Sequence, residues 1–86
     1  MKFCESIFHD FKAVSNTTLA IPMEKYMKNT FVFLGIKTEQ RRTIFKTKYL
    51  AHEIEIKSNF RNIAWELFNM KEREFHICAI DLLVKE

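Results

Sequence analysis

Turn-forming residues are nearly absent from this 86-residue chain, which contains one glycine, Gly35, and one proline, Pro22. The tight turns that join β-strands depend on such residues, because they adopt backbone conformations that other side chains resist. This scarcity disfavours an all-β fold and favours helices.

Cysteine is also scarce, since Cys4 and Cys78 are the only two in the chain. They form no C-x-x-C pair, and neither lies at metal-ligand spacing from His9, His52 or His76. We therefore expect two reduced, buried thiols and histidines at the surface or at helix ends. No metal or other cofactor is expected.

Long hydrophobic runs are missing as well, and no segment reaches the length that spans a membrane. The opening residues, MKFCESIFHDF, carry acids within their apolar pattern and lack the hydrophobic centre of a signal peptide. We therefore expect an intracellular, cytoplasmic protein with no membrane partner. In that setting the glycosylation sequon at residues 16–18 is a chance match.

Apolar residues are plentiful, because 48% of the chain is hydrophobic and nine residues are phenylalanine. This composition excludes a disordered chain and supplies large side chains for a small core. Apolar positions recur every three or four residues, as along one face of a helix; residues 60–68 and 75–83 share this spacing. We therefore predict an all-α fold of about five antiparallel helices, at about residues 2–15, 18–31, 38–51, 58–69 and 72–85.

Several helix ends have local signals. Pro22 is tolerated near a helix start or at a kink, so the second helix begins near Thr17 or Thr18, or at Pro22 itself. Gly35 would end that helix through a left-handed turn, and Thr38 would cap the third.

The segment at residues 51–56, AHEIEI, alternates weakly between apolar and polar residues. That alternation fits a short strand, whereas an all-helical context favours a loop or a helix end. Ser58 is then a plausible N-cap for the fourth helix.

Repeated helix pairs that each bury one face are typical of an α-solenoid, in which successive repeats stack. No linker or low-complexity tract divides residues 1–86, so we expect a single helical region. Its last helix keeps an apolar face on which another repeat would normally stack. We therefore expect the N-terminal part of a longer protein.

Positive charge is concentrated in residues 23–48, where seven lysines and arginines and two glutamates give a net charge of +5, against +3 for the whole chain. Clustered charge of this kind creates a local field that attracts polyanions. A nucleic acid is therefore the first partner that the charge pattern indicates.

Two segments in and beyond this basic stretch resemble the DNA alkylation repair family, the AlkD-like DNA glycosylases. They are MEKYMKNTFVFLGIKTEQRR at residues 23–42 and WELFNMKEREFHICAIDLL at residues 65–83. One departure is Glu39, where the family commonly has proline. The resemblance implies a HEAT-like solenoid that wraps duplex DNA in a basic concave face. It also implies hydrolysis of the N-glycosidic bond of purines alkylated at N3 or N7.

The resemblance supplies no catalytic residue to this chain. Family members place two tryptophans and an aspartate beside the lesion, where they stabilise positive charge on the sugar. Those residues belong to later repeats. Trp65 matches an earlier, structural tryptophan and is expected to pack, and Asp81 matches a scaffold helix.

The resemblance does carry over three DNA-binding positions: Tyr26, which would face the cleft, and Thr38 and Arg42, near the DNA backbone. Lys37 and Lys46, with Lys48, would add phosphate attraction. Each position also has a role that involves no DNA. Tyr26 could pack in the core, Thr38 could cap the third helix, and the lysines could simply be solvated. Arg41 points about 100° away from Arg42 on a helix, so we expect it to be solvated or paired with a carboxylate.

The sequence therefore favours a DNA-binding N-terminal part of an alkylpurine DNA glycosylase, acting on duplex DNA and non-catalytic by itself. The alternative is a helical-repeat scaffold that binds proteins, with self-association through the open face of its last helix. A helix-turn-helix DNA reader is a weaker third hypothesis.

Overall fold

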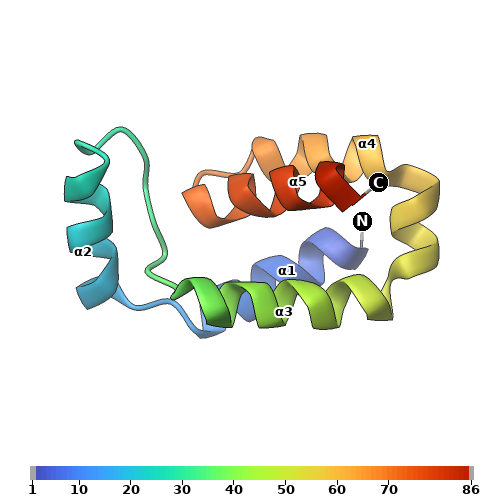
Figure 1. Ribbon diagram of the computed structural model, residues 1–86, viewed down its shortest axis with the longest axis horizontal. Coiled ribbons are helices and arrows are strands. Elements are labelled where there is room, and N and C mark those ends of the chain that lie inside the picture. Colours follow the sequence, from blue (N-terminus) through green and yellow to red (C-terminus); the bar gives the residue numbers. More distant parts are fainter. Residues whose placement is uncertain (1, 86) are drawn as a thin grey trace.

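The computed structural model describes residues 2–85 and is all-helical over that range, as the periodicity predicts. Within it, the only strand-like pairing is an isolated bridge between Val32 and Glu72. The five helices are α1 (Lys2–Ala13), α2 (Thr17–Tyr26), α3 (Thr38–Ala51), α4 (Glu53–Phe68) and α5 (Arg73–Lys85) (Figure 1).

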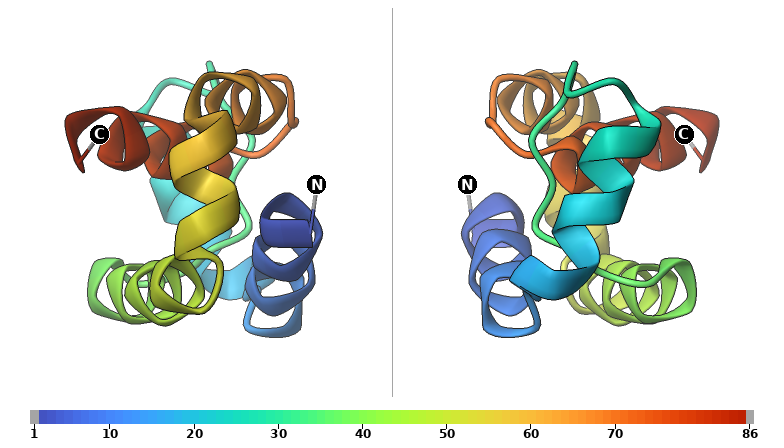
Figure 2. Two further views of the ribbon diagram at one scale, coloured as in Figure 1. Left: turned by 90° about the vertical axis from the view of Figure 1, so that its right-hand side faces the viewer. Right: turned by 90° about the vertical axis from the view of Figure 1, so that its left-hand side faces the viewer.

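The helices form two layers with one helix standing apart. Helix α1 packs on α3 in one layer, and α5 packs on the later part of α4 in the other (Figure 2). The first part of α4 rises between the layers and connects them. Helix α2 stands at one end of the molecule, beyond the beginning of α3 (Figure 1).

Aromatic side chains fill the space between the layers. Phe3 and Phe11 of α1 are fully buried, and so is Phe75 of α5. Phe11 stacks on Phe75 with ring centroids 5.4 Å apart, and Phe3 meets Phe45 of α3 edge-on at 6.3 Å. Such contacts join α1 to α3 and to α5, which are far apart in the chain, and buried Ile63 and Leu67 of α4 complete the core.

Both cysteines lie in this core as free thiols, which confirms the expectation of buried, reduced residues. Burial raises the pKa of Cys4 and of Cys78 to about 12. Both thiols therefore stay protonated at neutral pH, and a protonated, buried thiol is a poor nucleophile.

The predicted end of the second helix is wrong, because α2 stops at Tyr26 and not near residue 31. Lys28 and Asn29 adopt left-handed backbone angles, with φ of 54° and 58°, which a helix cannot continue. Gly35 has the expected positive φ of 86°, but it lies within the non-helical segment between α2 and α3 and not at the end of α2. Pro22 sits inside α2.

The start of the fourth helix also differs from the prediction. Helix α4 begins at Glu53, so residues 53–56 are helical and no strand forms there. Ser58 is not an N-cap; it precedes a kink at Asn59, where φ is −136°. The expectation that Trp65 packs is wrong too, because its side chain is 71% exposed on α4.

Candidate functional site

A buried carboxylate holds the segment that joins α2 to α3, residues 27–37, which we call the connector. Glu74, in the first turn of α5, is only 2% exposed. Its Oε1 accepts a hydrogen bond from the Leu34 N–H at 2.9 Å, and its Oε2 accepts from Gly35 at 3.0 Å and Ile36 at 3.3 Å. Three amides of this non-helical segment would otherwise lack partners, so Glu74 sets the path of the connector.

Further contacts anchor the connector along its length. The Phe33 N–H donates to Glu24 Oε2 of α2 at 2.8 Å, and the Arg73 N–H donates to the Val32 carbonyl at 2.7 Å. The Arg73 guanidinium lies over the Phe31 ring, 4.2 Å from its centroid. The connector thus ties α2 to the start of α5.

These contacts leave an apolar groove of about 440 Å³ between α2 and the body of the molecule. We call it the α2–α5 groove. Helix α2 and the connector supply most of its wall, and α3 and α5 supply the rest. Its lining residues are Leu19, Pro22, Met23, Tyr26, Met27, Phe33, Ile36, Thr38, Arg41, Glu74 and Ile77.

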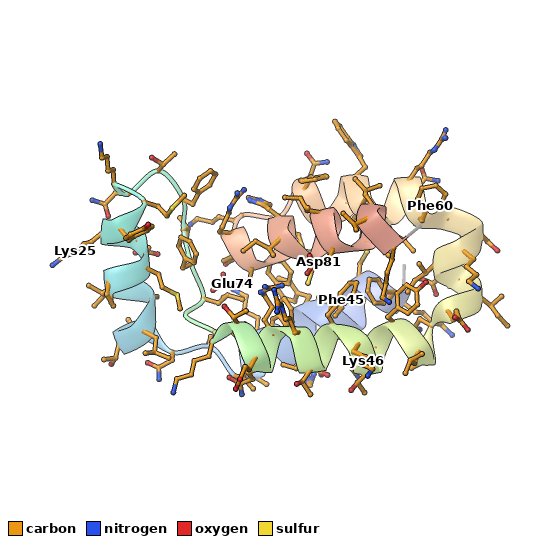
Figure 3. The ribbon with its side chains drawn as sticks, viewed as in Figure 1. Lys25, Phe45, Lys46, Phe60, Glu74 and Asp81 are labelled. Atoms are coloured by element: carbon orange, nitrogen blue, oxygen red, sulfur yellow. The ribbon has the colours of Figure 1, made fainter. Side chains whose placement is uncertain are left out.

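One ion pair bridges α3 and α5 beside this groove. Arg41 Nη1 lies 3.0 Å from Asp81 Oδ2, and the Arg41 side chain is only 8% exposed. Figure 3 shows Asp81 on the side of α5 that faces α3. Of the two roles expected for Arg41, solvated or paired with a carboxylate, the pairing is confirmed. Removing either partner would leave the other charge without compensation in a partly dry environment.

Comparison with known proteins connects this architecture to a family. Residues 7–86 match the family described as DNA alkylation repair enzyme. The chain belongs to that family. Membership indicates a role in DNA repair and a DNA-related partner. A search of curated proteins finds no significant match.

The five residues that the sequence predicts to bind DNA fall into two groups by their position in the structure. Tyr26, 87% exposed, and Thr38 meet at the α2–α5 groove. Lys37, Arg42 and Lys46 are exposed at or along α3, and Figure 3 shows Lys46 on the outer side of that helix. Their contact with DNA remains a prediction.

Two expectations for α3 are corrected in detail. Thr38 does not cap the helix, because it is the first helical residue and Lys37 occupies the N-cap position without a side-chain hydrogen bond. Lys48 is not a free cation, because its Nζ lies 3.2 Å from Asp10 Oδ2 of α1. A hydrogen bond from His9, together with Lys48, lowers the pKa of Asp10, which keeps that carboxylate ionised.

Sequence reasoning missed the role of Glu74, since an acid in the first turn of a helix is already explained by the helix dipole. Glu24 was likewise missed as a partner of the connector. The sequence carried no local signal for either contact, because the acceptors lie on α2 and α5 and the amides they satisfy lie in the connector.

Two kinds of feature are absent from the part of the chain that the structure describes. No cluster of three or more potential ligands could hold a metal ion among residues 2–85. None of the helices described there has the length and apolar character required to cross a bilayer.

Proposed function

We propose that this chain is the DNA-binding N-terminal part of an alkylpurine DNA glycosylase, and that its partner is duplex DNA with purines alkylated at N3 or N7. Family membership supports a repair role. The observation that carries the DNA-binding part is the exposed position of Lys37, Arg42 and Lys46 at the start of α3 and along it. We extend the proposal to a HEAT-like arrangement, which the two layers of paired helices support.

The proposed contacts follow from the geometry of α3. Thr38 and Arg42 are one turn apart, and Lys46 lies one further turn along the same side of the helix. The first turn of α3 also presents backbone N–H groups without helical partners, which favour a phosphate. Together these groups would follow a DNA backbone without reading its sequence.

Charge reversal tests this surface. We expect Arg42→Glu with Lys46→Glu to weaken binding to an undamaged duplex by at least about tenfold at low salt, and to reduce the salt slope by roughly 1.8, about 0.9 for each lost phosphate contact. Fluorescence anisotropy at several salt concentrations gives both values. The control variant, Arg61→Glu with Lys71→Glu, changes net charge equally on exposed positions away from α3.

Equal losses in the two double variants would show that only net charge matters and would contradict the proposed surface. Absence of duplex binding by the unmodified chain, even at low salt, would contradict the proposed function as a whole.

The chain by itself is expected to release no methylated base. Asp81 is paired with Arg41, so its carboxylate is not free to stabilise a cationic sugar, and Trp65 is the only tryptophan in the sequence. Base release is measured by incubating the chain with DNA that contains 3-methyladenine or 7-methylguanine. Chromatography then quantifies the released bases. Release above the spontaneous rate would contradict the non-catalytic assignment.

The alternative function is a protein-binding scaffold that self-associates through α5. Its support is a row of exposed apolar side chains there: Ile80 is 44% exposed, Leu83 42% and Val84 82%. Surfaces of this kind often mark interaction sites.

If the face of α5 mediates self-association, Val84→Lys with Ile80→Lys should convert a dimer to a monomer in sedimentation velocity. Leu50→Lys, which changes an exposed apolar residue on α3, serves as the control. A wild-type chain that stays monomeric at high concentration would exclude self-association through this face.

A further inference from the structure

Helix α2 ends in a left-handed turn that carries a lysine where glycine is the usual residue. Lys28 has φ of 54°, and Asn29 has φ of 58°. The Lys28 N–H donates to the Lys25 carbonyl at 2.9 Å. The Asn29 N–H donates to the Glu24 carbonyl at 2.7 Å. This pair of hydrogen bonds forms a Schellman motif, and Lys28 occupies its left-handed position, where a Cβ is disfavoured.

The fold gives no compensating contact to the Lys28 side chain. Lys28 is exposed, and its ammonium forms no ion pair with any residue that the structure describes. A cation near the end of a helix is favourable, but Lys25 in the last turn of α2 already supplies one. Residues other than glycine that hold such strained conformations cluster at sites that clamp ligands. We therefore look for the partner of Lys28 outside the chain.

The end of α2 forms a basic surface, residues 25–30, which we call the α2 tip. All its residues except Met27 are exposed, at the end of a helix that stands apart from the other four (Figure 1). Figure 3 shows Lys25 pointing away from the body of the molecule. Glu24 is the only acid between residues 17 and 36, and its carboxylate accepts from the Phe33 N–H. The α2 tip thus presents two uncompensated lysines beside hydroxyl and amide side chains, which also bind phosphate.

The α2 tip and the start of α3 lie at different walls of the α2–α5 groove. Tyr26 and Met27 of the tip line one wall, and Thr38 lines another. Exposed Lys37 and Arg42 lie on either side of Thr38 in the sequence. Within the groove both ionisable carboxylate and guanidinium groups are paired inside the protein, so no free charge lies between the two basic surfaces. A rigid polyanion across the groove would therefore meet cations on both sides of it.

We propose that the α2 tip is a second phosphate-binding surface for duplex DNA, with Lys28 and Lys25 each contacting one phosphate. The duplex lies across the α2–α5 groove, between this surface and the one on α3. This inference rests on the proposed DNA-binding function and adds residues to it. The contacts are with the sugar–phosphate backbone alone, and every base stays paired and stacked.

Lys28→Gly separates a lysine that binds DNA from one that serves the fold. Glycine adopts the left-handed conformation freely, so this variant should be more stable than the wild type, with a Tm raised by about 3 °C. It should nevertheless bind an undamaged duplex about threefold more weakly at low salt. Its salt slope should fall by roughly 0.9, the value for one phosphate contact. Thermal unfolding followed by circular dichroism and fluorescence anisotropy at several salt concentrations measure these effects.

Two further variants control for charge and for position. Lys28→Arg keeps the positive charge and should bind the duplex as the wild type does. Lys71→Gly makes the same substitution at an exposed lysine between α4 and α5, away from the α2 tip and from α3. It should leave both the affinity and the salt slope unchanged.

The outcomes separate this inference from the function on which it rests. Wild-type affinity and salt slope in Lys28→Gly would overturn the α2 tip as a contact and leave binding through α3 intact. Equal losses in Lys28→Gly and Lys71→Gly would show that only net charge matters and would also overturn it. A Tm below that of the wild type in Lys28→Gly would refute the strained backbone from which the inference starts. No duplex binding by the wild-type chain at low salt would overturn both proposals.

Discussion

Replacing Gly35 with alanine is expected to destabilise the fold by at least about 3 kcal/mol, which corresponds to a fall in Tm of roughly 15 °C for a domain of this size. Gly35 has φ of 86°, a conformation that side chains with a Cβ rarely adopt. A Cβ at this position would lie 2.0 Å from the Asn16 carbonyl oxygen and 2.7 Å from the Ala20 nitrogen.

Both of these contacts are with backbone atoms, so no side chain can rotate away to relieve them. The Asn16 carbonyl accepts the N–H of Ala20 at 3.0 Å, and the Asn16 N–H donates to the Leu34 carbonyl at 2.8 Å. Relief of the clash would therefore require movement of the start of α2 away from the connector. We expect the α2–α5 groove to be lost together with stability.

Thermal unfolding followed by circular dichroism measures the effect of Gly35→Ala. Thr17→Ala is the control, because Thr17 is exposed at the start of α2 and its loss should change stability by no more than about 0.5 kcal/mol. If Gly35→Ala has the same Tm as the wild type, the connector does not approach α2 as closely as the structure describes.

Replacing Glu74 with glutamine should have an effect of similar size, about 3 kcal/mol, because hydrogen bonds to a buried charged group are worth more than neutral ones. The shape of the side chain is retained. However, the new NH₂ group would face backbone N–H donors where Glu74 Oε1 or Oε2 now accepts from Leu34, Gly35 and Ile36. At least one buried amide would be left without an acceptor.

Chemical denaturation gives the loss in the free energy of unfolding for Glu74→Gln, and amide hydrogen exchange localises it. Protection should fall first at residues 34–36. Glu39→Gln makes the same chemical change at an exposed position in the first turn of α3 and should alter stability by no more than about 0.5 kcal/mol. Wild-type stability with unchanged exchange at residues 34–36 would refute the structural role of Glu74.

Helices with strong local signals were predicted well from the sequence. The third helix begins at Thr38 and ends at Ala51, as the pattern predicts, and α5 differs by one residue at its start. Amphipathic spacing is a property of the local sequence, so it predicts a helix without any knowledge of the fold. The predicted end of α2 was wrong because Lys28 and Asn29 take left-handed backbone angles, which asparagine tolerates but lysine gives no reason to expect. The predicted start of α4 was wrong because the helix begins at Glu53 and continues across a kink at Asn59.

The candidate site was predicted only in outline. The basic stretch and the resemblance pointed to Tyr26 and Thr38, and the structure brings these two residues together at one groove. The groove itself was not foreseen, because its walls come from α2, the connector, α3 and α5, and no periodicity relates them.

The sequence by itself determined that this protein is helical, that its positive charge is concentrated before residue 49, and that it belongs with DNA alkylation repair proteins. Only the tertiary structure decided which of two adjacent arginines is buried. Arg41 faces Asp81, and Arg42 faces solvent. It also decided that Glu74 holds the connector, because a buried carboxylate is stable only where the folded chain brings donors from a distant segment to meet it.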